Sequence, residues 1–404
     1  MSKIRQVDVT KLRRGMYVVD TAHGLVLAPP LYSVEGFILS PREGKELKKR
    51  GFLYAYINEA RSVVLPDADV EIDTTTKLRL DSPRVPLFYQ MVNYQDEVRK
   101  AQALHIQALA AAKQMHATLE AGLNENAIQA IQGVIKGTIE SLKRNENALL
   151  SIARLRNADE YTFTHSVNVA MYAVVLGRRL HVTDLCLEEL ALAGFFHDIG
   201  KILVPQEVLN FPGKLDDEQF KVMQAHAELG RIFLEHYPSV PAIARTGAMD
   251  HHERRNGSGY PLHKKEDEIS LVGKILAVAD VYDALTSQRC YKKAYSPSKS
   301  LSIMYTSKDE DFSPGFMEAF IEAMGVYPVG SLVKLSNNYI AVVVEQNQNL
   351  ALKPKLVTLI DAFGGKISYP KLLNLEIHSS ISIVEALQSL PLDIDLEQAV
   401  LYAT

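Results

Sequence analysis

The chain contains no tryptophan and only two cysteines among its 404 residues. Cys186 and Cys290 lie far apart and neither belongs to a CxxC pair, which argues against a disulfide framework and against a thiolate zinc site. Long apolar runs are also missing, since a stretch such as residues 190–196 is far too short to span a bilayer. The first residues lack the apolar core of a signal peptide, so a cytoplasmic protein is expected.

A large excess of one charge is absent as well. Lys and Arg number 44 against 48 Asp and Glu, which leaves a net charge of -4. This balance provides no general attraction to nucleic acid or to anionic lipid, although it is compatible with a local basic pocket. We therefore expect neither a nucleic-acid polymer nor a membrane as a partner. The hydrophobic content of 47% and the charged content of 23% are ordinary for a folded globular chain.

Composition and hydrophobic patterning divide the chain into five parts. These are a small α+β module (1–65), a linker (66–86), a helical connector (87–157), a mostly helical domain (158–327) and a small β-rich C-terminal region (328–404). A short helix is predicted at 41–50, before the stop signal of Gly51. Alternation of β-branched and aromatic residues predicts strands at 7–9, 16–19, 52–57, 332–335, 339–344 and 355–359.

The connector is predicted to hold two helices, because strong helix formers dominate residues 97–121 and a helical pattern follows over 126–157. Apolar residues of the second helix recur three or four apart and form one stripe, made of Ile128, Ile131, Ile135, Ile139 and Leu142. Two interpretations stay open. The favoured one is a helical hairpin packed on the next domain, and the other is a helix pair that forms a homodimer or transmits a signal.

Five of the twelve histidines lie with aspartates in one window of the helical domain. These side chains are His165, His197, Asp198, His226, His251, His252 and Asp280. Imidazole and carboxylate are ligands for Fe, Mn, Zn or Ni. Their context is apolar and helical, where an unpaired carboxylate carries a desolvation penalty that a metal ion or an arginine would remove. One such histidine is usually a core residue, but the adjacent pairs make a shared metal site the better interpretation.

Several short motifs in this window resemble those of one family. The motifs are YTFTHS (161–166), FHDIGK (196–201), HHE (251–253), GSGYP (257–261) and VADVYDAL (278–285). In this order and spacing they resemble the HD-GYP class of the HD metal-dependent phosphohydrolases. The first 65 residues are similar, more weakly, to a module often found ahead of HD-GYP domains. The resemblance implies a mainly α fold, in which a helical HD-type domain follows the α+β module and precedes a β-rich tail.

The function implied by this resemblance is that of an enzyme, a phosphodiesterase that hydrolyses cyclic di-GMP to linear pGpG or further to GMP. The seven side chains above would be the metal ligands, and Asp198 would bridge two metals. Lys201 would orient a phosphate oxygen beside Asp198. The nucleotide would be bound by residues of the GYP loop and of the segment after Asp280, namely Gly257, Gly259, Tyr260, Arg289 and Lys292.

The chemistry of a phosphodiester agrees with such a site. Its negative charge repels hydroxide, and two metal ions both lower the pKa of a bridging water and stabilise the attacking and leaving oxygens. The resemblance implies Fe or Mn as the divalent ions. Members with three metals have a glutamate at the position of Tyr161, so two metals are predicted here.

Two departures from the family pattern lie beside the GYP loop. Asn256 replaces a more usual aspartate, and residues 262–266 lack the usual Gly-Leu. They leave open a phosphodiesterase for mixed cyclic GMP-AMP, or a cyclic-dinucleotide sensor or scaffold with little hydrolysis. A hydrolase of an unrelated phosphomonoester is a weaker alternative, because simple HD hydrolases lack the GYP segment.

Overall fold

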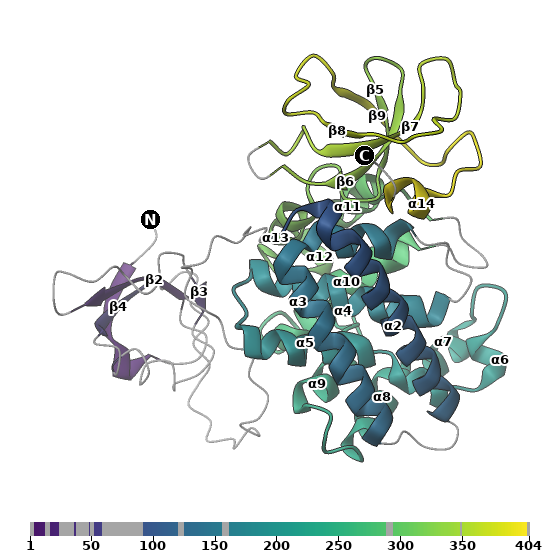
Figure 1. Ribbon diagram of the computed structural model, residues 1–404. Helices are drawn as coiled ribbons and strands as arrows, with labels where there is room; N and C mark the ends of the chain where they lie inside the picture. The colour runs from purple at the N-terminus through teal and green to yellow at the C-terminus, as the bar shows by residue number, and fades with distance from the viewer. Residues whose placement is uncertain are drawn as a thin grey trace.

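The computed structural model describes ten stretches of the chain, which are residues 4–12, 17–23, 36–37, 48, 52–58, 92–119, 125–155, 161–287, 294–347 and 350–401. Along these stretches, an antiparallel sheet comes first, a large helical body follows and a second antiparallel sheet comes last (Figure 1). The predicted mainly α fold class is therefore confirmed. The predicted linker (66–86) and all of the predicted helix at 41–50 except Lys48 lie outside the described residues.

The N-terminal sheet has the strand order β1-β4-β2-β3, and its strands pair antiparallel. They are β1 (Ile4–Asp8), β2 (Tyr17–His23), β3 (Gly36–Phe37) and β4 (Phe52–Asn58). The strand predicted at 7–9 ends one residue early, because Asp8 accepts a hydrogen bond from the Thr10 amide and begins the 3-10 turn η1 (Val9–Lys11). Buried Val7, Val9, Ala55 and Ile57 give this sheet a small apolar core.

The connector forms the predicted helical hairpin from α2 (Tyr94–Leu119) and α3 (Glu125–Leu155), whose bounds lie close to the predicted ones. All five residues of the predicted apolar stripe on α3 are buried, and the hairpin packs on α4 (Tyr161–Arg179) and α5 (Asp184–Phe196). This packing agrees with the favoured interpretation of the pair. Its use as a dimer contact stays a prediction.

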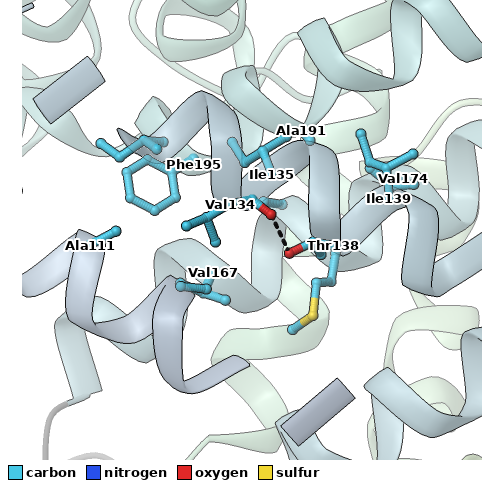
Figure 2. A pocket seen from close by; sticks show the side chains of 13 residues that line it. Ala111, Val134, Ile135, Thr138, Ile139, Val167, Val174, Ala191 and Phe195 are labelled. Atoms are coloured by element: carbon cyan, nitrogen blue, oxygen red, sulfur yellow. Dashed lines mark hydrogen bonds between the residues drawn. The ribbon is translucent and has the colours of Figure 1, made fainter. Parts of the chain in front are cut away.

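Figure 2 shows the apolar contact between the hairpin and the helical body. Ile135 and Ile139 of α3 lie beside Val174 of α4 and Phe195 of α5, and the cavity left between the helices is only about 20 Å³. The hydroxyl of Thr138, which lines this cavity, donates a hydrogen bond to the Val134 carbonyl at 2.9 Å and so has a partner. The hairpin thus packs closely against the body.

The helical body continues beyond α4 and α5 with short helices that follow one another closely. They are η2 (Ile199–Leu203), α6 (Gln206–Leu209), α7 (Asp217–Gln224), α8 (His226–Glu235), α9 (Ala242–Asp250), α10 (Leu271–Thr286), α11 (Pro297–Thr306), α12 (Lys308–Asp311) and α13 (Phe316–Met324). α4, α5, α9 and α10 pack on one another in the middle of the body. At the α4–α5 crossing a side chain at Gly194 would meet the Ala170 backbone at 2.8 Å, so these two helices approach very closely.

The C-terminal sheet has the order β8-β7-β6-β5-β9, with antiparallel pairing, and the small helix α14 follows it. Its elements are β5 (Leu332–Leu335), β6 (Ile340–Glu345), β7 (Lys355–Ile360), β8 (Leu372–Asn374), β9 (Ile383–Leu387) and α14 (Leu396–Leu401). The three predicted strands are β5, β6 and β7. Along β6, Val342 and Val344 join the core of the helical body, whereas Ala341 and Val343 belong to a separate cluster, as alternation in a strand requires.

Among the described residues, no helix combines the length and the apolar character that crossing a bilayer requires.

A buried ion pair joins the two helices of the hairpin. Glu97 of α2 has no exposed surface and accepts hydrogen bonds from Arg144 Nε at 2.8 Å, Arg144 Nη2 at 2.7 Å and Ser141 Oγ at 2.8 Å, both on α3. Burial alone raises the pKa of Glu97, but these hydrogen bonds outweigh it and leave the pKa below its usual value. The stabilisation is therefore present above the unfolded-state pKa and is lost as pH falls through the folded-state pKa.

We expect Arg144→Met to lower the free energy of unfolding by about 3 kcal/mol at neutral pH, because it leaves the Glu97 carboxylate buried without its cation. The loss should shrink in acid, where Glu97 is protonated. Urea denaturation at several pH values measures both effects. Arg231→Met is the control, since the exposed Arg231–Glu235 pair should contribute less than about 1 kcal/mol. Equal losses in the two variants would contradict the prediction.

Candidate metal centre and substrate loop

All seven side chains predicted as metal ligands meet at one place inside the helical body, although they come from five separate segments. One segment each is supplied by α4, the turn after α5, the start of α8, the turn after α9 and α10. The side chains form two groups whose ligand atoms lie within 4.8 Å of one another, Asp198 with His226, His251 and His252, and His165 with His197 and Asp280. Each group has the composition of a metal site, and the two groups are adjacent.

The carboxylate of Asp198 lies between the two groups. Its Oδ2 is 3.4 Å from His165 Nε2 and 3.3 Å from His197 Nε2. Its Oδ1 is 3.3 Å from His226 Nε2 and 3.7 Å from His251 Nε2. Oδ1 is buried and accepts no hydrogen bond from the described residues. The two oxygens of one carboxylate are thus directed to different groups, as in a bridging ligand.

Backbone carbonyls orient three of the imidazole rings. Nδ1 of His197, His226 and His251 lies 2.7, 2.7 and 2.9 Å from the carbonyl oxygen three residues earlier. A carbonyl can only accept, so in each neutral ring Nδ1 carries the proton and Nε2 keeps a free lone pair. Histidine metal ligands are commonly oriented in this way.

Two of these free lone pairs point at each other, because His226 Nε2 and His251 Nε2 are 3.3 Å apart. In the other group, His197 Nε2 lies 3.2 Å from His165 Nε2. Two lone pairs at this distance repel unless a cation lies beside them. Together with the unpaired Asp198 Oδ1, this arrangement shows that the donor set fits a bound metal ion.

The charge state of the cluster also suits a cation. Burial lowers the pKa of His197 and His252 and lowers that of His226 to about 4, so these rings are neutral at neutral pH. Burial also acts to lower the pKa of His165, but the adjacent Asp198, Asp280 and Asp283 carboxylates outweigh it and raise that pKa. Burial would raise the pKa of Asp198, but the nearby Lys201 ammonium and the hydrogen bond from His165 outweigh it and the pKa falls well below its usual value. Neutral imidazole and ionised carboxylate are the forms that bind a metal.

Asp283 supports the centre, and the sequence reasoning did not single it out. This buried carboxylate lies 2.8 Å from His165 Nδ1 through Oδ2, and its Oδ1 accepts from Asn168 Nδ2 at 2.8 Å. Ser287 Oγ donates to Oδ2 at 3.1 Å. Asp283 could have been predicted from its position three residues after Asp280 in a helical segment, because residues three apart are neighbours on the surface of a helix. Asp283 thus orients His165 toward the cluster.

The GYP loop folds back over the two adjacent histidines. The Tyr260 amide donates to the His252 carbonyl at 3.2 Å, and the Tyr260 and His252 rings lie 4.6 Å apart. Gly257 has φ of +81°, and a side chain at Gly259 would meet the His252 carbonyl at 2.5 Å, so both glycines are required by the backbone.

Two buried carboxylates hold the far side of this loop. Glu253 accepts from the Leu262 amide at 2.7 Å and from the Lys264 amide at 2.9 Å. Asp250 accepts from Lys264 Nζ at 2.7 Å. His263 has φ of +54°, the left-handed conformation that glycine adopts most easily. These hydrogen bonds therefore hold residues 262–266, which lack the usual Gly-Leu, against the turn that carries His251 and His252. No role was predicted from the sequence for Glu253 or Lys264.

Of the three basic residues predicted to contact phosphate, Lys201 alone belongs to the described residues. Lys201 Nζ lies 2.5 Å from Asp198 Oδ2, with 35% of its side chain exposed at the edge of the cluster. Arg289 and Lys292 lie outside the described residues, so their predicted contacts with phosphate stay predictions.

Comparison with known families agrees with this geometry. The HD domain family matches residues 143–314, which include all seven clustered side chains. The family described as a KOW domain associated with HD domain matches residues 332–391, where the C-terminal sheet lies. A domain of unknown function (DUF3391) matches residues 4–130, a range that reaches from the N-terminal sheet into the helical hairpin. The chain is thus an HD-domain protein with further domains on both sides.

Individual relatives indicate which group of HD-domain proteins the chain belongs to. Cyclic di-GMP phosphodiesterase PA4108 of Pseudomonas aeruginosa is 34% identical over 91% of this chain and 88% of its own length. 3'3'-cGAMP-specific phosphodiesterase 3 of Vibrio cholerae is 36% identical, over 42% of this chain and 36% of its own length. A cyclic di-GMP phosphodiesterase of Thermotoga maritima is 33% identical, over 41% of this chain and 45% of its own length. The chain belongs to the HD-GYP family of HD-domain proteins, as its motifs predict.

We expect Asp283→Asn to weaken metal binding by about 10- to 100-fold, because an amide offers one acceptor where the carboxylate receives His165, Asn168 and Ser287. Metal titration with analysis of the bound ions measures the loss. The control is Asp393→Asn, since Asp393 is exposed and far from the cluster in sequence. Unchanged metal affinity in Asp283→Asn would show that His165 does not need this partner.

Proposed function

We propose that the protein is a metal-dependent phosphodiesterase that hydrolyses cyclic di-GMP to linear pGpG. The observation that carries the proposal is the position of Asp198, whose two oxygens are directed to two separate groups of imidazoles. This is a donor arrangement suited to phosphodiester hydrolysis with a pair of metal ions. The near full-length similarity to a cyclic di-GMP phosphodiesterase supports the same substrate class.

The proposed cofactors are two divalent ions, Fe or Mn. His165, His197 and Asp280 would hold one ion, His226, His251 and His252 would hold the other, and Asp198 would contact both. When bound, the ions would supply a nucleophile at neutral pH and stabilise the negative charge of the phosphodiester. Imidazole and carboxylate without thiolate are compatible with either metal.

The side chains around the cluster have distinct proposed tasks. Lys201 lies beside Asp198 at the edge of the site, where its ammonium would orient a phosphate oxygen. Burial, with the nearby Asp198 and Asp280 carboxylates, raises the pKa of Tyr260 above its usual value, so the phenol keeps its proton. Tyr260 would donate a hydrogen bond to the substrate phosphate. Arg289 and Lys292 would bind the phosphates as the family resemblance implies.

Mixed cyclic GMP-AMP is the second candidate substrate. Relatives specific for 3'3'-cGAMP are 33% to 36% identical to this chain, and a cyclic di-GMP phosphodiesterase of Thermotoga maritima is 33% identical. The metal ions held by the clustered side chains would face a phosphate in either case, so the cluster does not separate the two substrates. Rates on both dinucleotides, measured with the same metal-loaded preparation, decide between them.

We expect Asp198→Ala to lose most of the bound metal and to lower kcat on cyclic di-GMP by at least about 100-fold. The physical reason is that the two oxygens of this carboxylate face different sets of imidazoles. Anaerobically purified, metal-loaded protein is assayed by product analysis, with metal content measured in parallel. Asp393→Asn is the control and should retain both activity and metal.

Three other results would contradict the proposal. Metal-loaded protein that hydrolyses neither dinucleotide would exclude the phosphodiesterase. If Asp198→Ala also bound cyclic di-GMP as tightly as the unchanged protein, the sensor or scaffold alternative would be favoured. Hydrolysis of linear nucleotides alone would instead indicate a phosphomonoester hydrolase.

A further inference from the structure

Phe220 presents an aromatic ring to solvent close to the candidate metal centre. It lies on α7, a short helix with no buried residue that packs against α6 and α8, and 46% of Phe220 is exposed. A single exposed apolar side chain is ordinary on a protein surface and needs no explanation. The position of this ring relative to the site is what makes it informative.

Phe220 is the outer member of a row of rings that begins at the cluster. The Phe220 and Tyr260 ring centroids are 6.1 Å apart, and the Tyr260 and His252 centroids are 4.6 Å apart. Tyr260 also lies 6.2 Å from the His226 ring. Both His226 and His252 belong to one group of candidate metal ligands. The row therefore leads from that group outward to the exposed ring.

The supports of the two outer rings are well defined. Asp216 and Gln219 form a reciprocal capping box that fixes the start of α7, three residues before Phe220. Glu253 holds the other side of the GYP loop, on which Tyr260 lies. An aromatic ring on a fixed element loses little freedom when a ligand packs on it, which favours binding.

We propose that Phe220 stacks against a purine base of the substrate while a phosphate lies at the metal cluster. This proposal rests on the proposed hydrolysis of a cyclic dinucleotide. In a nucleotide one ribose separates the base from the phosphate, and the Tyr260 ring separates Phe220 from the cluster. Bases stack on aromatic side chains regardless of their identity, so Phe220 contributes affinity for purines without separating guanine from adenine.

The first test compares a substrate that has bases with one that has none. Phe220→Ala should raise KM for cyclic di-GMP about tenfold, and leave hydrolysis of bis(p-nitrophenyl) phosphate by the same metal-loaded protein unchanged. Phe363→Ala is the matched control, because Phe363 is 99% exposed in the loop after β7 of the C-terminal sheet. It should leave both substrates unaffected.

The second test uses the absence of tryptophan from the chain. In a Phe220→Trp variant the introduced indole is the only one, so its fluorescence reports this position alone. A phosphorothioate analogue of cyclic di-GMP that resists hydrolysis should quench it with saturation, because a purine stacks on the indole. Phe363→Trp provides the control and should show no saturable change.

Each result of these two tests either supports or overturns the stacking of a purine on Phe220. An equal KM for Phe220→Ala and Phe363→Ala overturns the proposal. Equal losses on both substrates also overturn it, because the ring would then support the metal centre itself. If the protein hydrolyses no dinucleotide, the proposed function fails, and the fluorescence titration still decides whether a purine stacks at Phe220.

Discussion

The carboxylate of Asp198 lies inside an apolar helical body, with one oxygen directed to His165 and His197 and the other to His226 and His251. An ionised carboxylate in such a place is strongly destabilising unless positive charge lies next to it. Lys201 supplies one charge at the edge, and the converging lone pairs of His226 and His251 create a place for more. The site is therefore arranged so that positive charge can lie next to each of the two oxygens of Asp198.

The surrounding structure serves to hold these groups in place. Helix ends expose carbonyls that orient three of the imidazole rings, and Asp283 orients a fourth. On the other side, Glu253 and the Asp250–Lys264 pair hold the GYP loop against the histidine segment. The candidate metal ligands His251 and His252 and the loop that carries Tyr260 thus lie on one continuous stretch of backbone.

Much of this could be predicted from the sequence, because local patterns carry the information. The stripe of Ile128 to Leu142 predicted α3, alternating β-branched residues predicted β5, β6 and β7, and the motifs assembled the seven candidate ligands. β8, β9 and α14 were missed because their short segments have weak patterns of their own. Asp283 and Lys264 were missed because each is defined by a partner distant in the sequence or by a backbone turn.

The sequence by itself determined which residue types are present, their helical or extended periodicity, and the ordered motifs that identify the family. These follow from short-range physics, since the period of apolar residues selects helix or strand and since His and Asp are chemically suited to metals. Only the tertiary structure decided that the two oxygens of Asp198 are directed to different groups, that Lys264 joins Asp250 to the GYP loop, and that Phe220 lies beside Tyr260. These relations depend on packing between segments far apart in the chain, where distances of a few ångströms are set by all the helices together.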